Sequence, residues 1–169
     1  MNEEPRIPAF EMTERELFDF FISHLNRIFC AKNQLVEKLP QLRKSAHFRD
    51  LEQAIGETVE VVDMQIARMK QIYIMLDSVN QFEHCTGLVG LLDEAFQAIG
   101  AQEKNAAFRD LSILFYMQII ESVEVTSFRI LMQVASKIRQ PDVEQLLREC
   151  YDEAKEDRVL LKQISEHYI

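Results

Sequence analysis

The sequence predicts an all-α fold, an antiparallel four-helix bundle with one long crossover that carries a short extra helix. Helix breakers are rare, since the 169 residues include only four glycines and four prolines. Hydrophobic residues make up 47% of the chain and charged residues 28%, a balance typical of a folded protein. Four long segments carry apolar residues at helical spacing. We expect a tail over residues 1–12 and a single bundle domain over residues 13–169.

The first helix is expected from about residue 13 to about residue 44. The stretch TERE forms a capping box, in which Thr13 caps the helix and Glu16 reaches back to it. An apolar stripe follows at helical spacing, formed by Phe18, Phe21, Leu25, Ile28, Leu35, Leu39 and Leu42. Pro40 lies inside this helix, where we expect a kink or locally weakened hydrogen bonding.

The second helix is expected over about residues 47–77. Its apolar side is formed by Ile55, Val59, Val62, Ile66, Met69 and Tyr73. A short helix over residues 86–99 follows in the long connection. Gly100 is expected to end that helix as its C′ residue, because glycine readily adopts the left-handed conformation found there.

The third long helix is expected over about residues 105–138, and the turn RQPD follows it. Pro141 in this turn is well placed to begin the last helix, which runs to about residue 167. The four long helices are each about 40–50 Å long at a rise of about 1.5 Å per residue. With short turns and one crossover, they predict the ferritin-like arrangement.

Charge and composition exclude several classes of partner. A net charge of −9 disfavours binding to nucleic acid or to an anionic membrane surface. The N-terminal stretch MNEEPRIPAF lacks the pattern of a secretory signal, and no charge-free apolar stretch reaches the roughly 18 residues of a membrane span. We therefore expect a cytoplasmic protein. Its cysteines, Cys30, Cys85 and Cys150, are odd in number and lack Cys-x-x-Cys spacing, so we expect them to be reduced and buried.

Two carboxylates interrupt the apolar stretch ILFYMQIIESVEVTSFRILM of the third long helix. By helical spacing, Glu121 and Glu124 share a stripe with Leu114, Met117, Phe128 and Leu131. On the second helix, Glu60 and Asp63 have the same three-residue spacing at the edge of the apolar side. Buried carboxylates need a cation, and bundles of this kind supply it with two metal ions held by carboxylates and Glu-x-x-His pairs. The alternative for the acids of the second helix is a solvated face.

Five consecutive stretches carry the patterns of a known family with matching spacing: CAKNQLVEKLP at 30–40, ETVEVVDMQIARMKQIY at 57–73, HCTGLVGLLDE at 84–94, FRDLSILFYMQIIESVE at 108–124 and YDEAKEDRVLLKQISE at 151–166. They resemble the YciE/YciF-like family, whose members are bacterial, ferritin-like and stress-associated. The resemblance covers about residues 17–166. It implies a homodimer-forming bundle whose interior carboxylates are arranged like a rubrerythrin-type dinuclear site.

The chain departs from that family at the positions that would hold metal. Lys32 stands where the first helix of the family has a glutamate. On the second helix the expected Glu-x-x-His pair begins at Glu60 but ends in Asp63, so the imidazole is missing. On the last helix an aspartate is replaced by Arg158 and a glutamate by Ala154.

The candidate or remnant metal site therefore consists of the acids Glu60, Asp63, Glu121, Glu124 and Glu153. Lys32 and Arg158 are expected to face these acids and to supply the positive charge that metal ions would have supplied. The sequence thus predicts a homodimeric structural or binding protein with no cofactor and no catalytic residue. The alternative is a carboxylate-bridged oxidoreductase or metal-binding protein of the rubrerythrin-like type. It would hold iron, manganese or another divalent metal.

Overall fold

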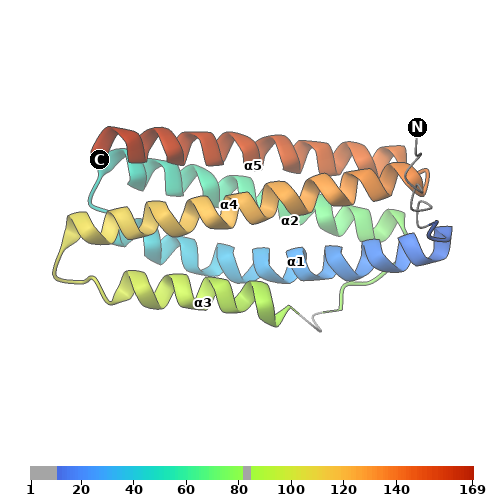
Figure 1. Cartoon of the computed structure of the whole chain (residues 1–169), viewed down its shortest axis with the longest axis horizontal. Helices are drawn as coiled ribbons and strands as arrows, with labels where there is room; N and C mark the ends of the chain where they lie inside the picture. Colours follow the sequence, from blue (N-terminus) through green and yellow to red (C-terminus); the bar gives the residue numbers. More distant parts are fainter. Residues whose placement is uncertain (1–10, 82–84) are drawn as a thin grey trace, which may run out of the picture.

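A computed structural model describes residues 11–81 and 85–169, which form five helices (Figure 1). They are α1 (Glu14–Ser45), α2 (Arg49–Met75), α3 (Thr86–Gly100), α4 (Ala106–Lys137) and α5 (Pro141–Tyr168). All four long helices and the short one begin and end within two residues of the limits expected from the sequence. Most of the expected N-terminal tail, residues 1–10, lies outside the described residues.

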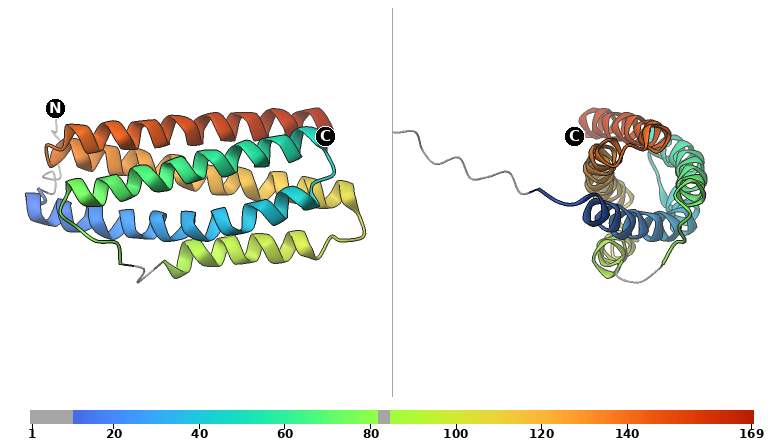
Figure 2. Two further views of the ribbon diagram at one scale, coloured as in Figure 1. Left: turned by 180° about the vertical axis from the view of Figure 1, so that it is seen from behind. Right: turned by 90° about the vertical axis from the view of Figure 1, so that its right-hand side faces the viewer.

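The four long helices form a ring in which each helix runs antiparallel to both of its neighbours (Figure 2). Around the ring, α1 packs against α2, α2 against α5, α5 against α4, and α4 against α1. The short helix α3 lies outside the ring and packs against α1 and α4. The crossover that contains α3 joins α2 to α4 at the opposite corner of the ring. This arrangement confirms the ferritin-like bundle with one crossover.

The helix ends confirm one capping prediction and correct another. The capping box is present, since the Glu16 amide donates to Thr13 Oγ1 and the Thr13 amide donates to Glu16 Oε2. Gly100, however, lies inside α3, and Ala101 after it has right-handed helical angles (φ −65°, ψ −13°). The prediction of a left-handed glycine is wrong, because the amide of Ala101 continues the helical pattern by donating to the Gln97 carbonyl.

The start of α2 is capped from another helix. No side chain of α2 caps its own N-terminus. Instead Asp110, which comes from α4 and is fully buried, accepts hydrogen bonds from the backbone amides of His47 and Phe48 at 2.6 and 2.5 Å. A carboxylate at this place satisfies free amides and interacts favourably with the helix dipole. This contact fixes α4 against the turn between α1 and α2.

The helix α4 is long and apolar enough to cross a membrane by length and composition. The charge-free stretch that a membrane span was expected to need is nevertheless absent from this described helix, because Asp110, Glu121, Glu124 and Arg129 interrupt it. In the bundle, α4 is a core helix whose inward face is buried by residues such as Ile113, Leu114, Met117 and Phe128. Length and apolar composition are here explained by packing inside the bundle.

Cys30 of α1 and Cys85, the residue before α3, form a disulfide. The prediction that all three cysteines are reduced is wrong for these two. They are 55 residues apart and meet because the crossover brings α3 against α1, which local sequence patterns do not reveal. Cys150 is free and buried, as expected, and burial raises the pKa of its thiol to about 12.

Candidate functional site

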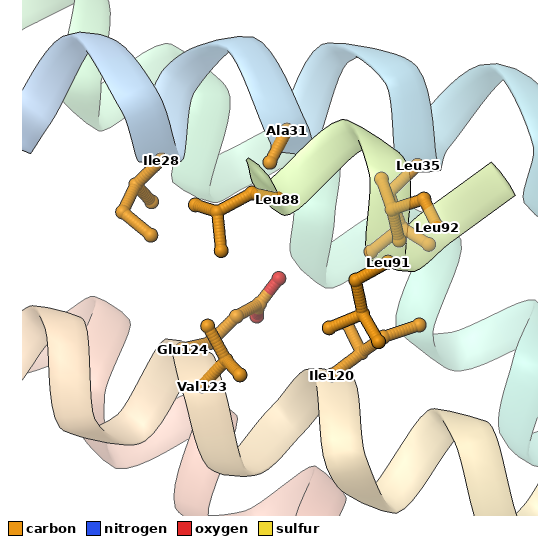
Figure 3. A pocket seen from close by; sticks show the side chains of 9 residues that line it. All are labelled: Ile28, Ala31, Leu35, Leu88, Leu91, Leu92, Ile120, Val123 and Glu124. Atoms are coloured by element: carbon orange, nitrogen blue, oxygen red, sulfur yellow. The ribbon is translucent and has the colours of Figure 1, made fainter. Parts of the chain in front are cut away.

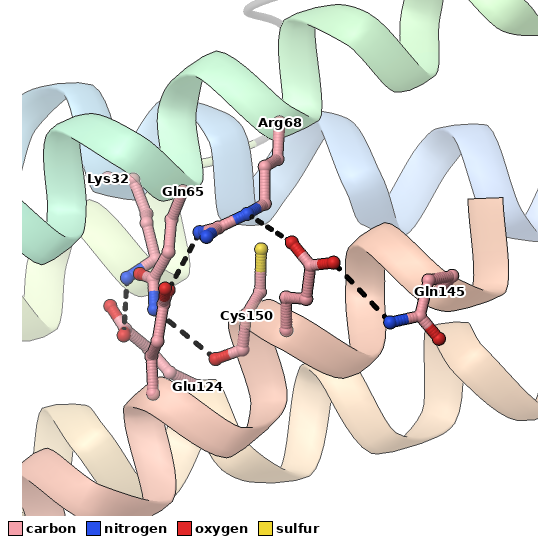
Figure 4. A network of polar contacts seen from close by, with 8 residues as sticks. Lys32, Gln65, Arg68, Glu124, Gln145 and Cys150 are labelled. Atoms are coloured by element: carbon pink, nitrogen blue, oxygen red, sulfur yellow. Dashed lines mark hydrogen bonds and ion pairs between the residues drawn. The ribbon is translucent and has the colours of Figure 1, made fainter. Parts of the chain in front are cut away.

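A buried ion pair crosses the middle of the bundle from α1 to α4. Lys32 is 1% exposed, and its Nζ lies 2.5 Å from Oε2 of Glu124, which is 6% exposed (Figure 4). The same ammonium lies 5.6 Å from the ring centroid of Phe128. A lysine is almost never fully buried unless it is paired. Lys32 is therefore the interior cation that the sequence predicted for this position.

Glu121 lies one turn before Glu124 on α4 and is 1% exposed. Neither of its carboxylate oxygens has a hydrogen-bond partner among the described residues. Burial raises the pKa of Glu121 well above its usual range; the charge of Glu124 raises it further, and the ammonium of Lys32 partly offsets this. The protonated form can donate a hydrogen bond to Glu124. One ammonium and one proton then balance two carboxylates.

Two side chains that the sequence analysis did not single out complete this cluster. Asp157 of α5 is partly buried, and burial raises its pKa to about 6, helped by the charge of Glu124 and opposed by Lys32 and by a hydrogen bond with Thr58 of α2. Asp157 lies three residues after buried Ala154, so the helical stripe of α5 contains the signal that places it inward.

The acids expected on α2 lie elsewhere. Glu60 and Asp63 are both exposed, so the solvated face that the sequence left as the alternative describes them. The buried positions of α2 include Thr58, Val62 and Gln65. These three follow one another at helical spacing. The two acids of α2 do not join Glu121 and Glu124.

Glu153 belongs to a separate network between α2 and α5. Arg68 of α2 donates to Glu153 Oε2 at 2.8 Å and to Glu149 Oε2 at 2.9 Å (Figure 4). Gln65, one turn earlier on α2, donates to the carbonyl of Cys150 at 3.2 Å. Arg68, which follows Gln65 by three residues on α2, was not predicted from the sequence as a member of the site. In the described part of the chain, the expected counter-charge Arg158 forms no ion pair with any of the candidate acids.

The residues of this site do not fit a dinuclear metal centre. Lys32 occupies the position on α1 where the family has a glutamate. On α2, the buried residues Thr58, Val62 and Gln65 stand in place of a carboxylate and an imidazole. Over residues 11–81 and 85–169, no three histidine, cysteine or acidic side chains are grouped so that they hold a metal ion. Bundles with two metals use a carboxylate from two helices and Glu-x-x-His from two others.

An apolar pocket of about 20 Å³ lies beside the ion pair, between α1, α3 and α4 (Figure 3). Its lining residues are Ile28, Ala31, Leu35, Leu88, Leu91, Leu92, Ile120, Val123 and Glu124. Glu124 is the charged member of this lining. The volume holds about one water molecule. The leucines of α3 thus lie between the carboxylate of Glu124 and the solvent.

A family model described as "Domain of unknown function (DUF892)" matches residues 16–169. The chain belongs to the DUF892 family. It is 27% identical over 158 residues to Protein YciF of Escherichia coli K12, covering 91% of this chain and 93% of that protein. The match confirms the YciF-like resemblance of this DUF892 protein.

Two solved structures share the fold of this DUF892 protein. The crystal structure of the E. coli stress protein YciF superposes with a TM-score of 0.84 at 26% identity and covers 90% of this chain and 96% of that one. YcfI from Rhodopseudomonas palustris superposes with a TM-score of 0.82 at 24% identity and covers 91% of this chain and 98% of that one. Both are similar over nearly the whole bundle.

Proposed function

We propose that this DUF892 protein is a stress-associated structural or binding protein whose buried carboxyl groups Glu121 and Glu124 are balanced by Lys32 and by a proton, without metal and without a catalytic residue. The observation that carries this proposal is the buried pair of Lys32 and Glu124 at 2.5 Å. The stress association rests on the similarity to YciF, which is described as a stress protein. A bundle with a charge-balanced and closed interior suits a supporting or partner-binding role.

Elemental analysis of the protein purified without chelator tests the absence of metal. We expect less than about one iron, manganese or zinc per chain, because an ammonium and neutral side chains replace the ligands of two helices. The same measurement on Lys32→Gln, which removes the interior cation, serves as the matched control. Two tightly held metal ions per wild-type chain contradict the proposal.

The second candidate is the carboxylate-bridged oxidoreductase or metal-binding protein of the rubrerythrin-like type. The observation that favours it is the pair of unpartnered oxygens of Glu121, buried near Glu124 and Asp157, since a divalent cation such as iron or manganese would satisfy them. A proton on Glu121 satisfies the same need. The variant Glu121→Gln separates the two explanations, because it imitates the protonated acid but removes a metal ligand. Retention of stability and an unchanged metal content support the proton.

We also propose that the protein forms a homodimer in the cytoplasm. The outer face of α4 supports self-association, because Phe115 is 59% exposed beside Ile119 and Val123 in a shallow surface hollow. Sedimentation equilibrium tests the dimer. Phe115→Glu is expected to shift it towards monomer, whereas Val159→Glu, a change of an exposed valine on α5, is the matched control and leaves it unchanged. Fractionation of the producing cells tests the location.

A further inference from the structure

The disulfide joins two parts of the chain that differ in accessibility. Cys30 lies in α1, two residues before Lys32, and is only 5% exposed. Cys85 is partly exposed and is the N-cap residue of α3. Reagents in solution therefore reach the sulfur of Cys85 more easily than that of Cys30.

The two halves of α3 are attached to the bundle by different means. The second half buries Leu92, Ala95 and Ile99, and its Asp93 accepts from Lys38 Nζ of α1 at 2.6 Å. The first half has no fully buried residue, since Leu88 and Leu91 are partly exposed. It also contains two glycines, which weaken a helix from within. The disulfide is consequently the strongest attachment of the first half.

The first half of α3 also covers the buried charges. Leu88 and Leu91 form the outer wall of the pocket whose inner wall includes Glu124 (Figure 3). Displacing these two leucines removes that wall and admits water to the carboxylate. The attachment of one short helix end thus controls access to the interior ion pair.

We infer that Cys30 and Cys85 form a redox-responsive site, and that reduction of their disulfide by a dithiol releases the first half of α3 and opens the pocket over Glu124. One thiolate of the reductant attacks the sulfur of Cys85, and Cys30 leaves as a thiolate and takes up a proton. The second thiol of the reductant then displaces Cys85, whose departing thiolate is stabilised at the helix N-terminus and then takes up the second proton. Two electrons and two protons pass to the protein, and the reductant becomes a disulfide.

Closure of the site requires an oxidant such as glutathione disulfide. In a reducing compartment disulfides are transient and regulatory, so the pair would be open in unstressed cytoplasm and closed by oxidation. Cys150 takes no part, because it is fully buried. The inference does not depend on whether metal is bound to the interior acids.

Hydrogen exchange of the full-length protein tests this inference. The protein is compared after treatment with glutathione disulfide and after reduction with dithiothreitol, with the disulfide verified by peptide mass. Reduction is expected to speed amide exchange over residues 86–92 by about tenfold or more and to leave α5 unchanged. Cys150→Ser should respond like the wild type. Cys85→Ser should exchange quickly under both conditions.

A chemical probe of the pocket gives a second readout that needs no variant. A water-soluble carbodiimide with glycine methyl ester is expected to modify Glu124 in the reduced protein and to spare it in the oxidised protein. Failure of glutathione disulfide to form the bond overturns the inference. So do equal exchange rates over residues 86–92 in the two verified redox states.

Discussion

Replacement of Lys32 by methionine removes the only ammonium seen to pair with the interior carboxylates of the described residues, while keeping a similar side-chain length. Glu124, which is 6% exposed, then has no cation. It either remains charged in an apolar interior or takes up a proton. Protonation at pH 7 of a carboxyl with an unfolded pKa of about 4.3 costs about 3.7 kcal/mol, and at pH 5 it costs about 1 kcal/mol. Removing one partner of a buried ion pair typically lowers the free energy of unfolding by about 3–5 kcal/mol.

We therefore expect Lys32→Met to lower the free energy of unfolding by about 3–5 kcal/mol at pH 7. For a chain of this size that corresponds to a fall in Tm of about 6–20 °C. The loss should shrink towards pH 5, because a carboxyl whose folded pKa is raised contributes stability below its unfolded pKa and loses it as pH rises. Urea unfolding followed by circular dichroism at both pH values measures the effect.

The matched control is Lys38→Met on the same helix. Lys38 also pairs with an acid, Asp93, but both side chains are substantially exposed (31% and 51%). Its loss should therefore cost less than about 1 kcal/mol. The double variant Lys32→Met, Glu124→Leu should regain most of the stability, since both charges are gone. If Lys32→Met and Lys38→Met cost the same at pH 7, the interior ion pair does not balance the cluster and the reasoning is refuted.

Three further outcomes follow from other contacts. Glu121→Gln should match the wild type near pH 5 and become relatively more stable towards pH 8 in urea unfolding, because the wild-type acid with its raised pKa loses stability as pH rises; a constant difference contradicts this. Asp110→Ala should lower the free energy of unfolding by about 2–3 kcal/mol and speed hydrogen exchange at the start of α2, with the exposed-site change Asp152→Ala as control. Reduction of the disulfide between Cys30 and Cys85, which are 55 residues apart, should lower the free energy of unfolding by about 4 kcal/mol. An unchanged urea midpoint after reduction contradicts that value.

The bundle could be predicted because its long helices obey local rules. Lys32 and the pair Glu121 and Glu124 were placed inward by the apolar residues one turn before and after each of them. Local spacing was misleading on α2, because two of its inward residues, Thr58 and Gln65, are polar and do not register in an apolar stripe. The inferred inner face was therefore rotated towards Glu60, which is exposed.

Contacts across the crossover could not be predicted from local pattern. The disulfide depends on where the short helix α3 docks, and docking is decided by packing between segments that are far apart in the sequence. The same holds for Arg68, whose two acidic partners lie on α5. The left-handed glycine was expected because many helices end in one. Here Ala101, after Gly100, keeps right-handed helical angles instead.

The carboxylate of Asp110 has a consequence for the order of assembly. The hairpin of α1 and α2 is synthesised first, but the amides of His47 and Phe48 that begin α2 are bonded by a residue more than 60 positions later. Until α4 emerges and docks, water is left to bond these amides, and the first turn of α2 frays. The nascent hairpin therefore reaches its final length late. Formation of the first turn of α2 is thereby coupled to the docking of α4, so the α1–α2 hairpin and α4 complete their folding together.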